Sequence, residues 1–102
     1  MKEKVSVFDP SEYLETEEDI AEYLTAVMEE GDVETFVAAL GDVAKARGMS
    51  IIAQETGLGR ESLYKSFKAG SKPRFDTIFK VLNSMGVHLE FKPNIEKAAV
   101  SI

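Results

Sequence analysis

The stretch MSIIAQETGLGRESLYKSFKAG, residues 49–70, decides the fold of this chain. Two short segments with the apolar spacing of helices lie on either side of residues 57–59, Gly-Leu-Gly. Ala53 is small, which lets a second helix cross closely above it, and Gly57 suits the left-handed backbone of a tight turn. Leu63, six positions after Gly57, would seat the second helix on the core. The spacing predicts a helix-turn-helix, although a helical hairpin with no role in DNA binding has the same spacing.

The polar side of the second segment supplies the residues expected to meet DNA. With Leu63 and Phe67 turned to the core at i, i+4 spacing, the other side chains of this segment face outward. The first turn of a recognition helix reaches base edges, and cations around its end lie near phosphates. The predicted DNA-binding set is Ser50, Gln54, Arg60, Glu61, Ser62, Tyr64, Lys65, Lys68, Lys72 and Arg74.

Each member of this set has a role that its chemistry permits. Arg60, Glu61 and Ser62 occupy the first turn and are the candidates for reading sequence. Arg60 suits a guanine, Tyr64 suits a thymine methyl or a phosphate, and Glu61 repels phosphate unless it accepts from a cytosine amino group. The phosphate backbone is assigned to Ser50, Gln54, Lys65, Lys68, Lys72 and Arg74. A basic surface that is merely solvated is the alternative.

The charge of the chain is divided between its two halves. The whole sequence has a net charge of −6. Residues 1–42 contain two basic and thirteen acidic residues, a net charge of −11, whereas residues 43–102 contain ten basic and five acidic residues, a net charge of +5. The half that would meet phosphates is therefore basic, and the acidic half suits a basic partner. An acidic helix face that only confers solubility is the alternative.

Helical spacing extends to three further segments. Caps and glycine stops predict helices at about 17–30, 33–47 and 74–85, besides one that starts at Ser50 and one at about 60–68. Thr16, Asp32 and Ser50 are the expected N-caps, because their side chains accept from first-turn amides. The apolar sides are Ile20, Leu24, Val27 and Met28 in the first helix, Phe36, Val37, Leu40, Val43 and Ala44 in the second, and Phe75, Ile78, Phe79 and Leu82 in the last.

Near the C-terminus the apolar period changes to two. Val87, Leu89 and Phe91 alternate with polar residues, which predicts one short β-strand over residues 87–92. A single strand needs a partner for its backbone groups. That partner is either residues 4–8, KVSVF, or the same strand of a second molecule, which would make a symmetric dimer.

The composition excludes several kinds of chemistry. The sequence has no cysteine, which excludes disulfides, thiolate metal sites and thiol catalysis. His88 is the only histidine, so a histidine triad or histidine metal cluster cannot be assembled, and we expect neither an enzyme nor a cofactor. Because the N-terminal sequence lacks signal-peptide features and no apolar run is long enough to span a bilayer, we expect a cytoplasmic protein.

Two longer segments resemble a known family. Residues 52–93, IAQETGLGRESLYKSFKAGSKPRFDTIFKVLNSMGVHLEFKP, with YLETEEDIAEYLTAVMEEGD at 13–32 ahead of them, resemble the addiction-module antidote proteins, or antitoxins. The helix order over about residues 33–86 is similar to that of lambda-repressor-like (Xre-type) helix-turn-helix domains. Together with the periodicities above, this implies an all-α fold: a lambda-repressor-like bundle of about five helices, with an extra acidic N-terminal helix and one short C-terminal β-strand.

The resemblance also implies a function. It implies an antitoxin of a type II toxin–antitoxin module, a homodimer that represses its own operon by binding double-stranded operator DNA and that neutralises a small basic RelE/ParE-like toxin. A stand-alone Xre-type transcriptional regulator and an interaction module without DNA affinity are the alternatives. The expected domains are an acidic extension with one helix at 1–32, the DNA-binding domain at 33–86, and a C-terminal strand and tail at 87–102.

Overall fold

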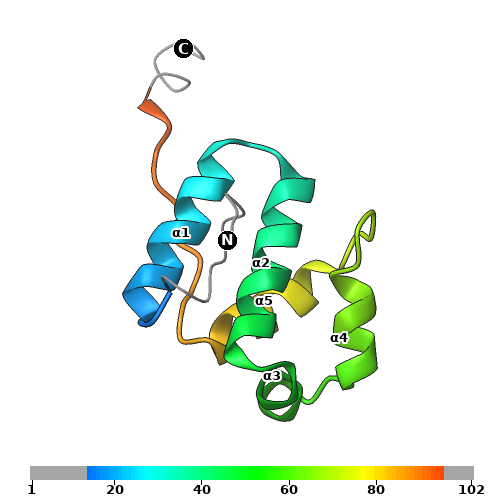
Figure 1. The fold of residues 1–102 in the computed structure, drawn as a ribbon. Helices are drawn as coiled ribbons and strands as arrows, with labels where there is room; N and C mark the ends of the chain where they lie inside the picture. Colours follow the sequence, from blue (N-terminus) through cyan, green and yellow to red (C-terminus); the bar gives the residue numbers. More distant parts are fainter. Residues whose placement is uncertain (1–13, 96–102) are drawn as a thin grey trace, which may run out of the picture.

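Five α-helices make up the fold in the computed structural model of the chain, which describes residues 14–95. They are α1 (Glu17–Glu29), α2 (Val33–Arg47), α3 (Met49–Thr56), α4 (Arg60–Ser66) and α5 (Phe75–Ser84). α2 lies between α1 and the other helices, and α3 contacts α2, α4 and α5 (Figure 1). The predicted all-helical class is confirmed, and the bounds of all five predicted helices agree to about two residues, as expected for frayed ends.

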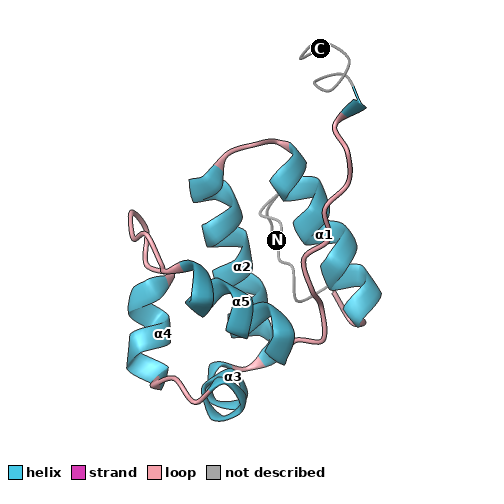
Figure 2. Ribbon diagram, turned by 180° about the vertical axis from the view of Figure 1, so that it is seen from behind, coloured by secondary structure: helices cyan, strands magenta, loops and turns pink. Residues whose placement is uncertain are grey.

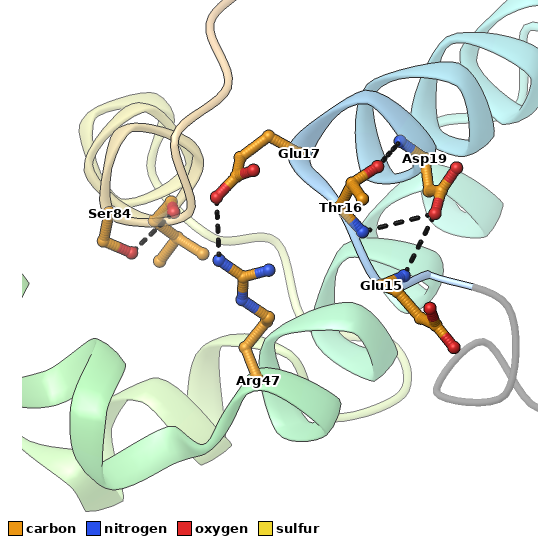
Figure 3. Close-up of polar contacts among 7 residues, drawn as sticks. Glu15, Thr16, Glu17, Asp19, Arg47 and Ser84 are labelled. Atoms are coloured by element: carbon orange, nitrogen blue, oxygen red, sulfur yellow. Dashed lines mark hydrogen bonds and ion pairs between the residues drawn. The ribbon is translucent and has the colours of Figure 1, made fainter.

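A capping box fixes the start of α1. The Thr16 hydroxyl accepts a hydrogen bond from the Asp19 amide at 3.0 Å (Figure 3). The Asp19 carboxylate accepts in return from the amides of Thr16 at 3.2 Å and Glu15 at 3.1 Å. These bonds satisfy amides that have no partner within the helix, and the acidic first turn complements the helix dipole. The predicted cap at Thr16 is therefore confirmed.

Asp32 caps α2 as the sequence predicts. Its carboxylate accepts from the Glu34 amide at 3.2 Å and from the Thr35 hydroxyl at 2.6 Å. The hydrogen bond from Thr35 holds the pKa of Asp32 below its usual value, so this cap weakens only as the pH falls through that lowered pKa. The whole predicted apolar side of α2 is buried: Phe36, Val37, Leu40, Val43 and Ala44.

Phe67 lies in close contact with α2 at Gly41. A Cβ atom at position 41 would lie 2.8 Å from the Cβ of Phe67, which is too close for side-chain packing. Phe67 is only 7% exposed, so the chain just after α4 is seated directly on the backbone of α2. The absence of a side chain at Gly41 makes this contact possible.

Replacing Gly41 with alanine is therefore expected to destabilise the fold. Overpacking costs about 1–3 kcal/mol, and the better helix propensity of alanine offsets up to about 1 kcal/mol of that, so we expect a net loss of about 1 kcal/mol. The free energy of unfolding in urea measures the effect. The control, Lys45→Ala at an exposed position of the same helix, should change it by less than about 0.5 kcal/mol. Unchanged or raised stability for Gly41→Ala would contradict the close contact.

The N-cap of α3 differs from the prediction. Gly48, not Ser50, is the N-cap, and the helix begins at Met49. Gly48 has φ of +108°, a backbone conformation that suits glycine, and its amide donates to the carbonyls of Ala44 and Lys45 at 3.0 and 3.1 Å. One glycine thus ends α2 and starts α3 with no intervening loop. Ser50 lies inside the first turn of α3.

The predicted β-strand over residues 87–92 is wrong. These residues have no regular secondary structure, and residues 14–95 contain no strand. Val87 is 8% exposed and Leu89 is partly buried, so the alternation does mark an inward side, but that side packs against the helical core beside α1 (Figure 2). Phe91 is 93% exposed. The partner suggested at residues 4–8 lies outside the described residues.

The predicted apolar side of α5 is confirmed at Ile78 and Leu82 and wrong at Phe75 and Phe79. Val81, Leu82 and Met85 are buried and Ile78 is partly buried, which are i, i+3, i+4 and i+7 spacings. Phe75 and Phe79, expected on the same side as Ile78, are 64% and 46% exposed. Their rings lie at the edge of the packed side and contact each other, with centroids 6.2 Å apart.

Candidate nucleic-acid interface

The connection between α3 and α4 is a three-residue turn, Gly57–Gly59, held by local hydrogen bonds. Gly57 has φ of +78°, and its amide donates to the Ala53 carbonyl at 3.0 Å. The Thr56 hydroxyl donates to the Ile52 carbonyl at 2.8 Å and accepts from the Leu58 amide at 3.2 Å. Thr56 therefore fixes the direction in which the chain leaves α3.

Thr56 was not among the residues predicted to shape this turn. Its hydroxyl joins the last turn of α3 to Leu58, the first residue after Gly57. The threonine side chain thus supplies hydrogen bonds that backbone groups would otherwise make. The available signal was a threonine directly before a turn glycine. Gly57 itself was expected, and no atom lies within 4 Å of where its Cβ would be, so the glycine is needed there only for its backbone conformation.

The residues predicted to seat this helix pair do so. Leu63 is fully buried and Phe67 is 7% exposed, and both belong to the main hydrophobic core. Ala53 and Leu58 are partly buried and pack against the same core. α4 is therefore held from its inner side, and its orientation is fixed by apolar contacts.

All the predicted DNA-binding residues are exposed, and they come from three consecutive parts of the chain. Two lie on α3 one turn apart, five lie on α4, and three lie in and at the end of the loop that leads to α5. In chain order they are Ser50, Gln54, Arg60, Glu61, Ser62, Tyr64, Lys65, Lys68, Lys72 and Arg74. Their placement on the surface agrees with the prediction, and their contact with DNA stays a prediction.

Arg60 and Tyr64 form the best-defined contact on the outer face of α4. The guanidinium carbon of Arg60 lies 5.8 Å from the centroid of the Tyr64 ring, a cation–π contact across one helical turn. Tyr64 remains 41% exposed. The ring thus contacts the guanidinium itself, and Arg60 remains exposed on the surface of α4.

The loop after α4 is ordered by Ser71, a second residue that the sequence analysis did not single out. Its hydroxyl donates to the Lys65 carbonyl and its amide donates to the Lys68 carbonyl, both at 2.9 Å. Ser71 thereby bonds to one carbonyl in the last turn of α4 and to one two residues after the helix ends. The loop is folded back on α4, so Lys68 and Lys72 extend the cationic surface that begins at Lys65.

Arg74 is less available than the lysines. Its Nε lies 3.2 Å from a carboxylate oxygen of Asp76, two residues along at the start of α5. Both side chains are largely exposed, at 84% and 56%, so the pair is weak and a phosphate can compete with Asp76 for the arginine. The sequence predicted a phosphate contact for Arg74, and the pair with Asp76 was not expected.

Other kinds of site are not found in the part of the chain that the structure describes. Residues 14–95 contain no cluster of histidine, aspartate and glutamate side chains that could hold a metal ion. No helix in that part combines the length and the apolar character needed to cross a membrane.

A model of one protein family, described as "Probable addiction module antidote protein", matches residues 4–93. The chain belongs to this family of antidotes. A protein from Haemophilus influenzae, described as "Uncharacterized protein", is 39% identical over 90 residues, which cover 88% of this antidote and 93% of the relative. No solved structure matches the chain. The resemblance to the addiction-module antidote proteins is confirmed, and the match includes the acidic α1 as well as α3 and α4.

Proposed function

We propose that this antidote is the antitoxin of a type II toxin–antitoxin module and the repressor of its own operon. Membership of the antidote family supports a toxin partner and a regulatory, non-enzymatic role. In the proposal, α3 and α4 form a lambda-repressor-like (Xre-type) helix-turn-helix that binds operator DNA. The protein works in the cytoplasm, and its toxin is small, basic and RelE/ParE-like.

The observation that carries the DNA-binding part is the two-sided character of α4. Leu63 is fully buried on one side, while Arg60, Tyr64 and Lys65 are exposed on the other. A short helix anchored in this way can enter a major groove with its inner contacts intact, because no core residue must move. Arg60 then reads a base edge, and Lys65 and the loop lysines contact the phosphates on either side.

A homodimer follows from the size of this surface. One copy of α4 reaches only a few base pairs, and useful specificity requires two half-sites about one helical turn, roughly 34 Å, apart. The proposed division of labour is a DNA-binding domain at 33–86 and an acidic extension at 1–32 that contributes to toxin binding. Residues 87–102 form no separate unit in this proposal.

The test is binding to DNA from just upstream of this protein's own operon, compared with a scrambled fragment, over a series of salt concentrations. Lys65, Lys68, Lys72 and Arg74 from two protomers contact roughly six to eight phosphates, so log K should fall against log salt with a slope of about −5 to −7. Fluorescence anisotropy measures the affinity for each fragment and its dependence on salt. Equal affinity for the two fragments, with or without the toxin, would contradict the repressor function.

A further inference from the structure

A groove of about 600 Å³ lies between α1 and the segment that follows α5. Ala21, Leu24 and Met28, one turn apart, form the apolar α1 side of it. Val87 and Leu89 line the opposite side. We call this feature the α1 groove. Met28 is 44% exposed, so this part of the apolar lining is accessible to a partner.

The rim of the α1 groove is acidic. It carries a single lysine, Lys92, against four carboxylates, those of Glu17, Glu18, Glu29 and Glu90. Glu17 is paired with Arg47 of α2 at 3.5 Å (Figure 3). Within the described residues, Glu18, Glu29 and Glu90 make no ion pair. Apolar side chains and carboxylates thus line the same groove, and three of the carboxylates have no ion-pair partner within residues 14–95.

We propose that the α1 groove is where the toxin binds, through a cationic amphipathic helix. This inference rests on the proposed antitoxin function and adds the place of contact and the chemistry of the contacting segment. α1 has 13 residues, about 20 Å, which matches a partner helix of roughly three to four turns. The apolar side of such a helix packs on the floor, and its basic side chains meet the rim.

The same features argue against other occupants. A second copy of this chain packed here about a two-fold axis would place acidic rim against acidic rim, and like charges in an interface are unfavourable. DNA phosphates would be repelled for the same reason. Met28 favours a protein partner, because its flexible thioether side chain adapts to an apolar surface.

The experiment uses the full chain of this antidote. The binding probe is the purified protein encoded by the gene next to its own. That protein qualifies as the toxin if its expression alone arrests growth and co-expression of the wild-type antidote relieves the arrest. Calorimetry compares wild type, Glu18→Lys/Glu29→Lys on the groove rim, and Glu34→Lys/Glu55→Lys away from it. The control matches the charge change and the helix positions, since Glu18 and Glu34 lie in first turns and Glu29 and Glu55 in last turns. Met28→Asp tests the floor, and circular dichroism verifies that every variant is folded.

We expect the rim variant to lose about tenfold or more in affinity and Met28→Asp to lose about as much, with the control within about threefold of wild type. Equal losses in the rim variant and its control would show that only total charge matters, and would overturn the groove as the contact. Wild-type affinity in both groove variants would overturn it as well. In either case, relief of growth arrest by wild type would leave the proposed antitoxin function standing. If the wild-type antidote neither binds such a protein nor relieves the growth arrest, the proposed antitoxin function itself is wrong.

Discussion

Replacing Arg60 and Lys65 together with alanine is expected to lower the affinity for operator DNA by about a hundredfold or more, with little change in thermal stability. Both side chains are exposed, and neither contributes to the core. A bidentate arginine–guanine contact is worth about 1–3 kcal/mol, and each contact occurs twice in a dimer. The melting temperature should shift little, because the substitution removes only the cation–π contact between Arg60 and Tyr64.

The two substitutions also differ in what they change. Arg60→Ala should relax the preference at one base pair of each half-site, whereas Lys65→Ala should weaken binding to all sequences and reduce the salt slope by about one per protomer. The matched control is Lys80→Ala/Lys92→Ala, which removes the same charge from positions outside the proposed interface. We expect this control to bind within about threefold of wild type. Equal losses in the two double variants would reduce the role of α4 to general electrostatic attraction.

Leu63→Ala should have the largest effect on stability. Leu63 is fully buried in the main core, and removing a buried leucine side chain costs about 2–5 kcal/mol. A domain of this size has about 5–15 kcal/mol in total, so the variant loses a large part of its stability. DNA binding should fall with it, because α4 loses its anchor to the core.

Urea denaturation followed by far-ultraviolet circular dichroism measures the effect of Leu63→Ala. The exposed neighbour provides the control: Ser62→Ala should change the free energy of unfolding by less than about 0.5 kcal/mol. A loss below about 1 kcal/mol for Leu63→Ala would mean that α4 is not seated through this residue. The comparison with Arg60→Ala/Lys65→Ala then separates loss of fold from loss of contact.

The helices were predictable from the sequence because local signals specify them. Thr16 with Asp19 and Asp32 with Thr35 place the starts of α1 and α2 through hydrogen bonds to residues two or three positions away. Gly57 places the turn before α4 through its own backbone conformation. None of these features depends on distant parts of the chain, so the helix bounds agree closely with those expected.

The errors arose where tertiary packing decides between two local possibilities. The alternation of Val87 and Leu89 fits a strand or an irregular segment lying against helices, and no neighbouring strand exists in residues 14–95 to favour the first. α5 has two overlapping apolar stripes, and its packing in the folded core, including that against α3, leaves Phe75 and Phe79 outside. Periodicity alone does not distinguish these cases.

The exposed residues of the candidate interface were predictable from the sequence, but the residues that hold its turn and loop in place were not. Burial of Leu63 and Phe67 fixes which side of α4 is exposed, and helical spacing gave that side directly. Thr56, Ser71 and Asp76 were missed, because small polar residues in turns have many local roles and their partners become evident only in three dimensions.

The proposed DNA and toxin surfaces lie on different parts of the fold. α1 and α4 are on opposite sides of α2 in both ribbon views (Figures 1 and 2). The carboxylates of α1 are thus kept away from the helix expected to approach phosphates, which would allow a chain of net charge −6 to bind DNA as proposed. The separation also allows each surface to be altered without the other.

The most direct test of DNA recognition by α4 is to titrate labelled operator, at one salt concentration, with wild type, Arg60→Ala/Lys65→Ala and Glu18→Lys/Glu29→Lys. We expect the α4 variant to lose about a hundredfold or more in affinity, and the groove variant to bind at least as tightly as wild type because it is less acidic. Operator binding by the α4 variant with wild-type affinity and preference would contradict the assignment of α4 as the recognition helix.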